Sequence, residues 1–554
     1  MSRPMLGCQI APQYQDGYDF SSISESDTGG QVHAATSFPL PQLQDTLVDT
    51  QANRAVNSAS IRPTDLQRGR TKSSRRTEIE QKPVGFFHSS MAGVRLHVIK
   101  LWFRTNLILA VSIMAFLCLF WGALFRQNAN VASLSIWVVD FDSEPPHTGV
   151  APFVGPFVTQ VIHDIIDEGG VVPGYTFASP KDFDSDPSKV RDSVYDFHAW
   201  AAVIINPNAS AMLEAAVRQG NASYDPLGAC QIIYNSARDQ TTSSTYIVPS
   251  MNTLQKRVVT GFGRAWISHL LQNNLSVIDM HIDVSPQALT PGIEFTVYDL
   301  RPFGPPIATP AVSIGLIYLI IISFFSFTFF LPIHLKYLSP RGHPPLHFYQ
   351  LILWRYVATV ASYFLLSLVC SLVSLAFLMP MKRPKAAHDQ PANNPNAYGS
   401  GTFLVYWMGN WIGMIAFGLA SENMAMLLGT PWTALWLIFW VISNVATGFY
   451  ALELASSFYR WGYGWPMHNV VELTRSILFD LHPRVGLNFG ILFAWVTADT
   501  VLFPLCCYYM RWNTARVKKN VAKAEADWHA KMNKEREDPC LLARITTLRE
   551  KKSY

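Results

Sequence analysis

The sequence predicts an α-helical polytopic membrane protein of about six spans, with an α/β domain inserted outside the membrane. Three observations predict this class. The chain contains long apolar runs without charged residues. Short strand-like and helical segments occupy the stretch between the first two runs. The net charge differs between the segments that the runs separate. Of the 554 residues, 49% are hydrophobic and only 15% are charged, whereas about 25% are charged in ordinary soluble domains.

Five stretches of membrane-spanning length contain no Asp, Glu, Lys or Arg. A helix needs about 20 apolar residues to cross the hydrocarbon core of a bilayer. The five stretches are 107–125, 311–331, 356–379, 401–421 and 423–452. The fifth helix is expected to begin near Trp432, after a Gly-Thr-Pro sequence, and a sixth run, 486–510, is uncharged apart from Asp499. Six spans place both termini on one side of the membrane.

The first run indicates a signal anchor. It begins at Leu107, too far into the chain for a cleaved signal peptide with its short basic leader. We expect this span over residues 91–125. Residues 1–90 are rich in Ser, Gln, Asp and Pro and have no sustained apolar period, which predicts a disordered cytosolic tail.

Charge predicts the sidedness. Residues 1–106 hold 12 basic and 9 acidic residues, residues 126–310 hold 10 and 18, and residues 511–554 hold 12 and 6. Basic segments next to membrane helices are retained in the cytosol. The charges therefore predict cytosolic termini, with 511–554 as a basic tail, and an external domain over 126–310.

Glycosylation acceptors agree with this orientation, and one basic loop opposes it. All three Asn-x-Ser/Thr acceptors, at Asn208, Asn221 and Asn274, lie in the stretch predicted to be external, and glycans are added only outside the cytosol. The loop 381–400, which carries Arg383 and two neighbouring lysines, would also be external and is the weakest point of the six-span interpretation.

The stretch 126–310 alternates short strands with helices. The pattern predicts strands at 134–142, 201–206 and 229–235, and helices at 210–219 and 250–273. A further helix is indicated by Phe157, Val161 and Ile165, which recur at helical spacing. Alternation of this kind is typical of a compact α/β domain.

The segments "WVVDFD", "AAVIINPNASAMLEAAVRQGN" and "IIYNSARDQTTSSTYIVPSM" occur in this order between the first span and the five others. This arrangement resembles the membrane subunits of ABC-2-type exporters and their phage-infection-protein relatives. The chain more closely resembles the fungal nitrosoguanidine-resistance membrane protein family, which shares the basic N-terminal tail, the single early span, the acidic strand end and the segment "RWGYGWPMHN" at 460–469. The resemblance covers about residues 90 to 510.

The resemblance implies residence in the plasma membrane, or else in another endomembrane, and a part in tolerance of toxic compounds. The chain departs from a complete ABC exporter in one respect. It contains no Gly-Lys pair, so it has no GxxxxGK[ST] loop for nucleotide phosphates and cannot hydrolyse ATP by that route.

Three ionisable residues near or within the spans are candidates for function, because a charged side chain at a helix centre costs about 3 kcal/mol on insertion scales. Arg355 and Glu453 are placed near span ends, where we favour side chains that reach the interface. Asp499 is mid-span, five residues before Pro504. For Asp499, a role toward substrate, proton or an ionic partner and a role as a buried structural hydrogen bond remain equally open.

The segment 466–482, between the fifth and sixth spans, predicts an amphipathic helix. One face would be apolar and the other would carry Glu472, Arg475, Ser476 and Asp480. Such a helix is expected in a membrane interface, as in the short external helical element of ABC-2 exporters. Packing as a cap on the helical bundle is an equally good interpretation.

Together these features lead us to expect a non-enzymatic, ABC-2-like protein of toxic-compound resistance that moves or redistributes amphiphilic compounds or lipids. Expected partners are membrane lipids, amphiphilic small molecules, and either further copies of the chain or a separate energising or regulatory subunit. No cofactor, metal or nucleic acid is expected. The alternative is a non-transporting regulatory scaffold, which the missing energy-coupling motif favours, whereas Asp499 favours transport.

The sidedness predicts N-glycans on at least one of Asn208, Asn221 and Asn274. Treatment of membranes with a glycan-removing amidase should therefore sharpen and lower the band of the protein on a gel. An unchanged band, combined with protection of the N-terminal tail from protease and cleavage of the 381–400 loop from the cytosolic side, would reverse the orientation.

Overall fold

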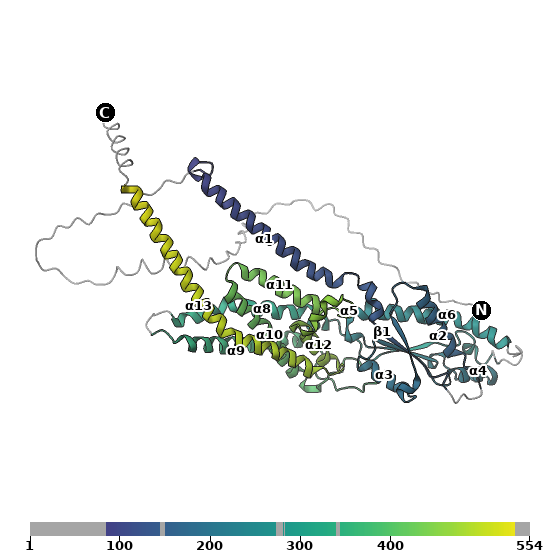
Figure 1. The fold of residues 1–554 in the computed structure, drawn as a ribbon. Coiled ribbons are helices and arrows are strands. Elements are labelled where there is room, and N and C mark those ends of the chain that lie inside the picture. Colours follow the sequence, from purple (N-terminus) through teal and green to yellow (C-terminus); the bar gives the residue numbers. More distant parts are fainter. Residues whose placement is uncertain (1–84, 145–149, 273–280, 282, 339–343, 538–554) are drawn as a thin grey trace, which may run out of the picture. The chain divides into compact units, whose positions relative to one another are not determined.

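The chain is described here from a computed structural model that covers residues 85–144, 150–272, 281, 283–338 and 344–537. Most of the predicted N-terminal tail and the acceptor Asn274 lie outside these residues. From Ser89 onward the chain forms one compact unit, in which a five-stranded sheet adjoins a bundle of long helices (Figure 1). We call residues 126–305 the sheet region.

The sheet is mixed, with strand order β2-β1-β3-β4-β5. Its strands are β1 (Ser135–Asp140), β2 (Gly174–Ala178), β3 (Ala201–Ile205), β4 (Cys230–Tyr234) and β5 (Phe295–Asp299). All neighbouring pairs are parallel except β3 and β4. The three central strands are those that the sequence predicts, and the two that it misses are the edge strands β2 and β5.

Helices cover both faces of the sheet. They are α2 (Val154–Glu168), α3 (Pro187–Tyr195), α4 (Ala209–Gln219), the short α5 (Gln240–Thr242) and α6 (Val248–Gln272). Side chains of α2, α4 and α6 pack on one face with Val138, whereas α3 packs on the other face with Val139 (Figure 1). Strands buried on both faces read as continuous apolar runs, which explains why β1, β3 and β4 are recognisable in the sequence.

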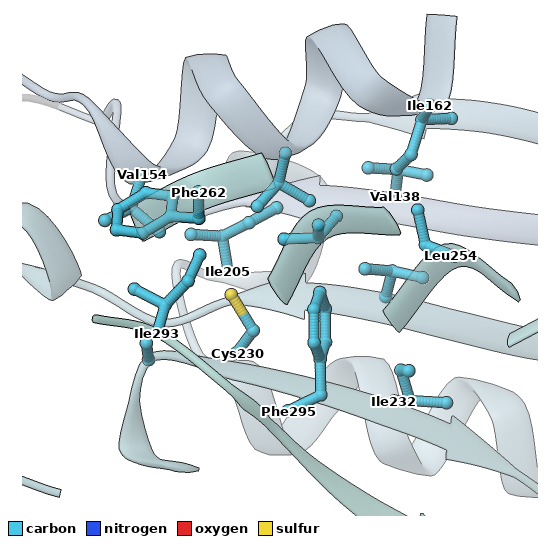
Figure 2. Close-up of a cluster of buried hydrophobic side chains, with 14 of the residues drawn as sticks. Val138, Val154, Ile162, Ile205, Cys230, Ile232, Leu254, Phe262, Ile293 and Phe295 are labelled. Atoms are coloured by element: carbon cyan, nitrogen blue, oxygen red, sulfur yellow. The ribbon is translucent and has the colours of Figure 1, made fainter. Parts of the chain in front are cut away.

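Figure 2 shows the core on the α2 side of the sheet, where Val154 and Ile162 of α2 meet Val138 and Phe262. The helical spacing read from the sequence is correct, but the residues chosen are displaced by one position. Val154, Val158 and Ile162 are fully buried, and the predicted apolar set that includes Phe157 is only partly buried beside them.

The acidic end of β1 joins the starts of two helices. Asp142 is 6% exposed, and its carboxylate accepts hydrogen bonds from the backbone N–H of Ser210 at 2.8 Å and from the Ser210 hydroxyl at 2.5 Å. The same hydroxyl accepts the backbone N–H groups of Phe153 and Val154 at 2.7 and 2.9 Å. These contacts satisfy N–H groups at helix starts, which have no partner within the helix.

Among the described residues, five helices are long and apolar enough to cross a membrane. They are α1 (Ala92–Leu124), α8 (Ile314–His334), α9 (Phe348–Ala376), α10 (Thr402–Leu428) and α13 (Val485–Glu537). The sixth predicted span, α11 (Trp432–Gly448), begins where the sequence places it, but its 17 residues are near the lower limit for a span. The helix α13 continues through much of the predicted basic tail.

The helix α12 (Pro466–Phe479) corrects the interfacial prediction. Its apolar side packs in the helical bundle, and its polar side is also buried, since Arg475 is 8% exposed and Ser476 is 3% exposed. Arg475 pairs with Asp239 of the sheet region at 3.0 Å and donates to the carbonyl of Arg238 at 3.0 Å. The polar face of α12 is therefore turned toward protein instead of water, as packing on the bundle requires.

Arg301, two residues after β5, is the central contact between the sheet region and the bundle. Its side chain is fully buried and pairs with Asp480, directly after α12, at 3.5 Å. It also donates to the carbonyl oxygens of Asp480 at 3.1 Å, Gln390 at 3.0 Å and Ala387 at 2.9 Å. We call this set of contacts the Arg301 junction.

The basic loop 381–400 is part of this junction. The ring of His388 stacks on Tyr195 of α3 at 4.2 Å between centroids, and the amide of Asn396 donates to the carbonyl of Leu478 at 2.9 Å. The loop therefore lies at the same end of the bundle as the sheet region. This is the arrangement that the six-span prediction requires of both segments.

Replacing Arg301 with Leu should destabilise the protein by about 3–5 kcal/mol, because removal of one partner leaves a buried carboxylate and several carbonyl oxygens unpaired. The measurement is thermal unfolding of the purified chain in detergent. Arg218→Leu is the matched control, since Arg218 pairs with Glu214 on an exposed surface of α4, where such pairs contribute about 0–1 kcal/mol. Equal melting temperatures for the two variants would refute the structural importance of the junction.

Candidate functional site

A cluster of charged and polar side chains lies inside the bundle, where α9, α10 and α13 meet. Arg355 of α9 forms an ion pair with Glu422 of α10, and the two residues are 2% and 3% exposed. The hydroxyl of Thr359 donates to Glu422 at 3.4 Å, and the guanidinium of Arg355 also contacts the sulfur of Cys507 at 3.5 Å. The expectation that Arg355 reaches the interface is therefore wrong.

The sequence interpretation missed Glu422 because it treated this residue as a break between two uncharged runs. In the structure α10 continues through Glu422 to Leu428. A single acidic residue in an apolar helix signals a buried cation nearby, since an unpaired charge in hydrocarbon is costly. Arg355, 67 positions earlier in the chain, is that cation.

Asp499 of α13 lies in the same part of the bundle and is 5% exposed. The amide of Asn423, next to Glu422, donates to the backbone carbonyl of Asp499 at 3.0 Å and to its Oδ1 at 3.4 Å. The second carboxyl oxygen, Oδ2, is buried and has no hydrogen-bond partner among the residues that the structure describes. Asp499 thus makes a structural hydrogen bond and keeps one oxygen available for a proton or a donor group.

The other predicted polar residues gather beside the sheet region. Glu453 lies five residues beyond the end of α11 and is exposed. Together with Glu472 and Arg475 it lines a small cavity of about 50 Å³. The opposite wall of this cavity includes Arg238, whose guanidinium lies 3.8 Å from the ring centroid of Trp200.

Burial alters the proton affinities in this small cavity. Burial lowers the pKa of Arg238 to about 10, against the opposing effect of Glu453 and Glu472. It also lowers the pKa of His468, which lines the same cavity. Acidic and basic side chains from both the sheet region and α12 line the wall, so we assign this cavity to the contact between the sheet region and α12.

A larger cavity of about 480 Å³ opens among α8, α9, α10 and the short helix α7 (Ala308–Val312). We call it the lateral pocket. Its wall contains no charged residue and is mostly apolar; its polar members include Ser374, Tyr406 and Asn410. Val373 and Phe377 at its rim are 53% and 65% exposed on the surface of the bundle.

None of the site residues predicted from the sequence lines the lateral pocket. Its wall combines one turn of α7 and parts of three long helices that are up to 103 positions apart in the chain, from Ile307 to Asn410. Apolar residues that line it have the same sequence pattern as apolar residues that face lipid. Only Asn410, a polar residue inside an uncharged run, could have indicated it.

Comparison with known proteins shows the family of this chain. Residues 105–501 match the model of a family described as "Protein of unknown function (DUF3533)". A relative, the "Uncharacterized endoplasmic reticulum membrane protein YJR015W" of Saccharomyces cerevisiae, is 28% identical over 442 residues, which are 76% of this chain and 82% of the relative. No solved structure matches the chain.

The buried ion pair predicts an unusual pattern of stability. Arg355→Met alone should destabilise the protein by about 3–5 kcal/mol, because Glu422 is then buried without a cation, whereas the double variant Arg355→Met, Glu422→Leu should be close to the parent. Thermal unfolding in detergent gives the comparison. A double variant that is as unstable as the single variant would show that the pair does not act as a unit.

Proposed function

We propose that this chain, which belongs to the DUF3533 family, is a multi-pass membrane protein that takes amphiphilic molecules or lipids from the bilayer and moves or redistributes them. The observation that carries the proposal is the lateral pocket. Ligand pockets are typically concave, mostly apolar and about 300–1,000 Å³ in volume, with a few placed polar groups. The lateral pocket has each of these properties.

The position of the rim supports entry from the membrane. Val373 and Tyr318 are more than half exposed on helices of membrane-spanning length, so lipid chains surround them in a bilayer. Phe377, also more than half exposed, directly follows the last residue of α9. The inner wall is closed by Leu319 and Asn410, which are each 2% exposed. A molecule can therefore enter sideways and leave its polar end deeper in the bundle.

The location follows the yeast relative. The name of that relative places it in the endoplasmic reticulum membrane. We propose the same or another endomembrane for this chain, with the sheet region in the lumen and both termini in the cytosol. Tolerance of nitrosoguanidine-type compounds is the expected phenotype, by the family resemblance. Since the sequence has no nucleotide loop, movement is passive exchange, is driven by a proton gradient, or is energised by a partner.

A regulatory scaffold is the second candidate function. It is favoured by the Arg301 junction, which holds the sheet region firmly to the bundle through several hydrogen bonds. A rigid external platform of this kind suits a protein that organises its neighbours. The two candidates differ in whether the purified chain acts on lipid by itself.

Filling the lateral pocket should reduce the activity. Cys370→Trp adds a large side chain at a half-buried position in the wall, and overpacking that costs about 1–3 kcal/mol should weaken ligand occupancy on the order of tenfold. The measurement is redistribution of fluorescent phospholipid by the purified chain in vesicles, with and without nucleotide or a proton gradient. Val373→Trp at the rim is a second variant for the case that Cys370→Trp unfolds.

Cys118→Trp is the matched control, because Cys118 is an exposed cysteine on α1 and is not part of the pocket wall. We expect it to retain the parental rate. Redistribution that persists in both pocket variants would remove the pocket from the function. No redistribution by the parent, together with unchanged toxic-compound tolerance in cells that carry the pocket variants, would favour the scaffold.

A further inference from the structure

One buried polar atom at the inner end of the lateral pocket has no partner. Asn410 of α10 lines the pocket and is 2% exposed, and its Oδ1 makes no hydrogen bond within the described chain. A buried carbonyl oxygen without a donor destabilises the protein by about 1–3 kcal/mol. Such an atom in the wall of a cavity can accept a hydrogen bond from a molecule that enters the cavity.

The orientation of this amide follows from its neighbour. The hydroxyl of Ser371 donates its only proton to the carbonyl of Ser367 at 2.8 Å. Ser371 can therefore only accept from Asn410, and the amide nitrogen of Asn410 lies 3.0 Å from it. The free atom is thus the oxygen, which is an acceptor, and the missing group is a donor.

A pair of hydroxyl groups completes the polar end of the pocket. The hydroxyls of Tyr406 and Ser374, both in the pocket wall, lie 3.2 Å apart, and either can donate to the other. One of the two protons remains available after that bond forms. Tyr406 is four residues before Asn410 on α10, so the two side chains lie on the same face of the helix.

This pattern of one acceptor beside one donor matches a hydroxyl group, which donates and accepts at once. A charged headgroup does not match, because the pocket wall contains no charged residue and burial of an unpaired charge is strongly unfavourable. The apolar remainder of the wall suits a hydrocarbon body. These properties together define the chemical class of the ligand.

We propose that the lateral pocket binds a neutral amphiphile with a hydroxyl head, which donates a hydrogen bond to Oδ1 of Asn410 and accepts one from the Tyr406–Ser374 pair. Sterols, ceramides and diacylglycerols share this chemistry. The proposal rests on the proposed function, since it uses the same pocket, and it adds the substrate class. Charged phospholipids then surround the protein in the bilayer but do not bind in this pocket.

The test compares each lipid with its O-methyl derivative, which keeps the hydrocarbon body and the acceptor oxygen, removes the donor and adds one methyl group. Cholesterol, a ceramide and a diacylglycerol are titrated separately into the full chain in detergent, and occupancy is read by native mass spectrometry. At least one parent lipid should bind about tenfold more tightly than its methyl ether, as expected for a hydrogen bond that satisfies a buried acceptor. The lipid that shows the largest ratio identifies the source.

Two variants assign the preference to Asn410. Asn410→Leu removes the acceptor and should reduce the ratio between hydroxyl lipid and methyl ether to near one. Ser371→Ala removes the partner of the amide nitrogen but leaves Oδ1 in place, so it should retain most of the preference. Melting temperatures of both variants show whether each one is folded.

The outcomes separate this inference from the proposed function. Equal binding of hydroxyl lipids and methyl ethers, with both lost in Cys370→Trp, would refute the hydroxyl inference and leave the pocket as an amphiphile site. Tighter binding of phosphatidylserine than of every neutral lipid would also refute it. Binding of all lipids that is unchanged by Cys370→Trp would remove the pocket itself and with it both proposals.

Discussion

The arrangement of the bundle depends on the guanidinium of Arg301. This group is fully buried and contacts residues of the 381–400 loop and of the chain directly after α12. The loop joins α9 to α10, and the chain after Arg301 leads through α7 into α8. One side chain thus fixes the ends of the three long helices that line the lateral pocket. A guanidinium suits this position because it donates several hydrogen bonds from one rigid plane.

The interior of the bundle shows how charge is accommodated away from water. Arg355 and Glu422 are both buried and neutralise each other, with Thr359 completing the contacts of the carboxylate. Asp499 forms no ion pair within the described part of the chain, and Asn423 supplies its hydrogen bonds. Because hydrocarbon cannot solvate any of these groups, α9, α10 and α13 have to remain in mutual register. The polar cluster therefore restricts sliding of these helices beside the pocket.

The sequence predicts features that depend on local pattern and misses those that depend on distant partners. Strands β1, β3 and β4 are recognisable because burial on both faces makes them continuously apolar, whereas β2 contains Gly174 and Thr176 and is half exposed at an edge. The amphipathic pattern of α12 is predicted correctly. No local feature of the sequence indicates that its polar side packs against Asp239 of the sheet region. In the sequence, Glu422 interrupts the uncharged pattern of α10. Its partner Arg355 is too distant in the chain for the ion pair to be recognised from local pattern.

The contact between Asp142 and Ser210 has a consequence for the order of events during synthesis. Ser210 is also the hydroxyl residue of the Asn208 glycosylation acceptor. In the folded sheet region Ser210 is 3% exposed, and its hydroxyl is engaged by three partners. In the proposed lumenal orientation, a transferase that must reach both Asn208 and Ser210 can act only before α2 and α4 dock on the sheet. Attachment of sugar at Asn208 is then a race between modification and folding, and the fraction of chains modified there records how quickly this part of the protein closes.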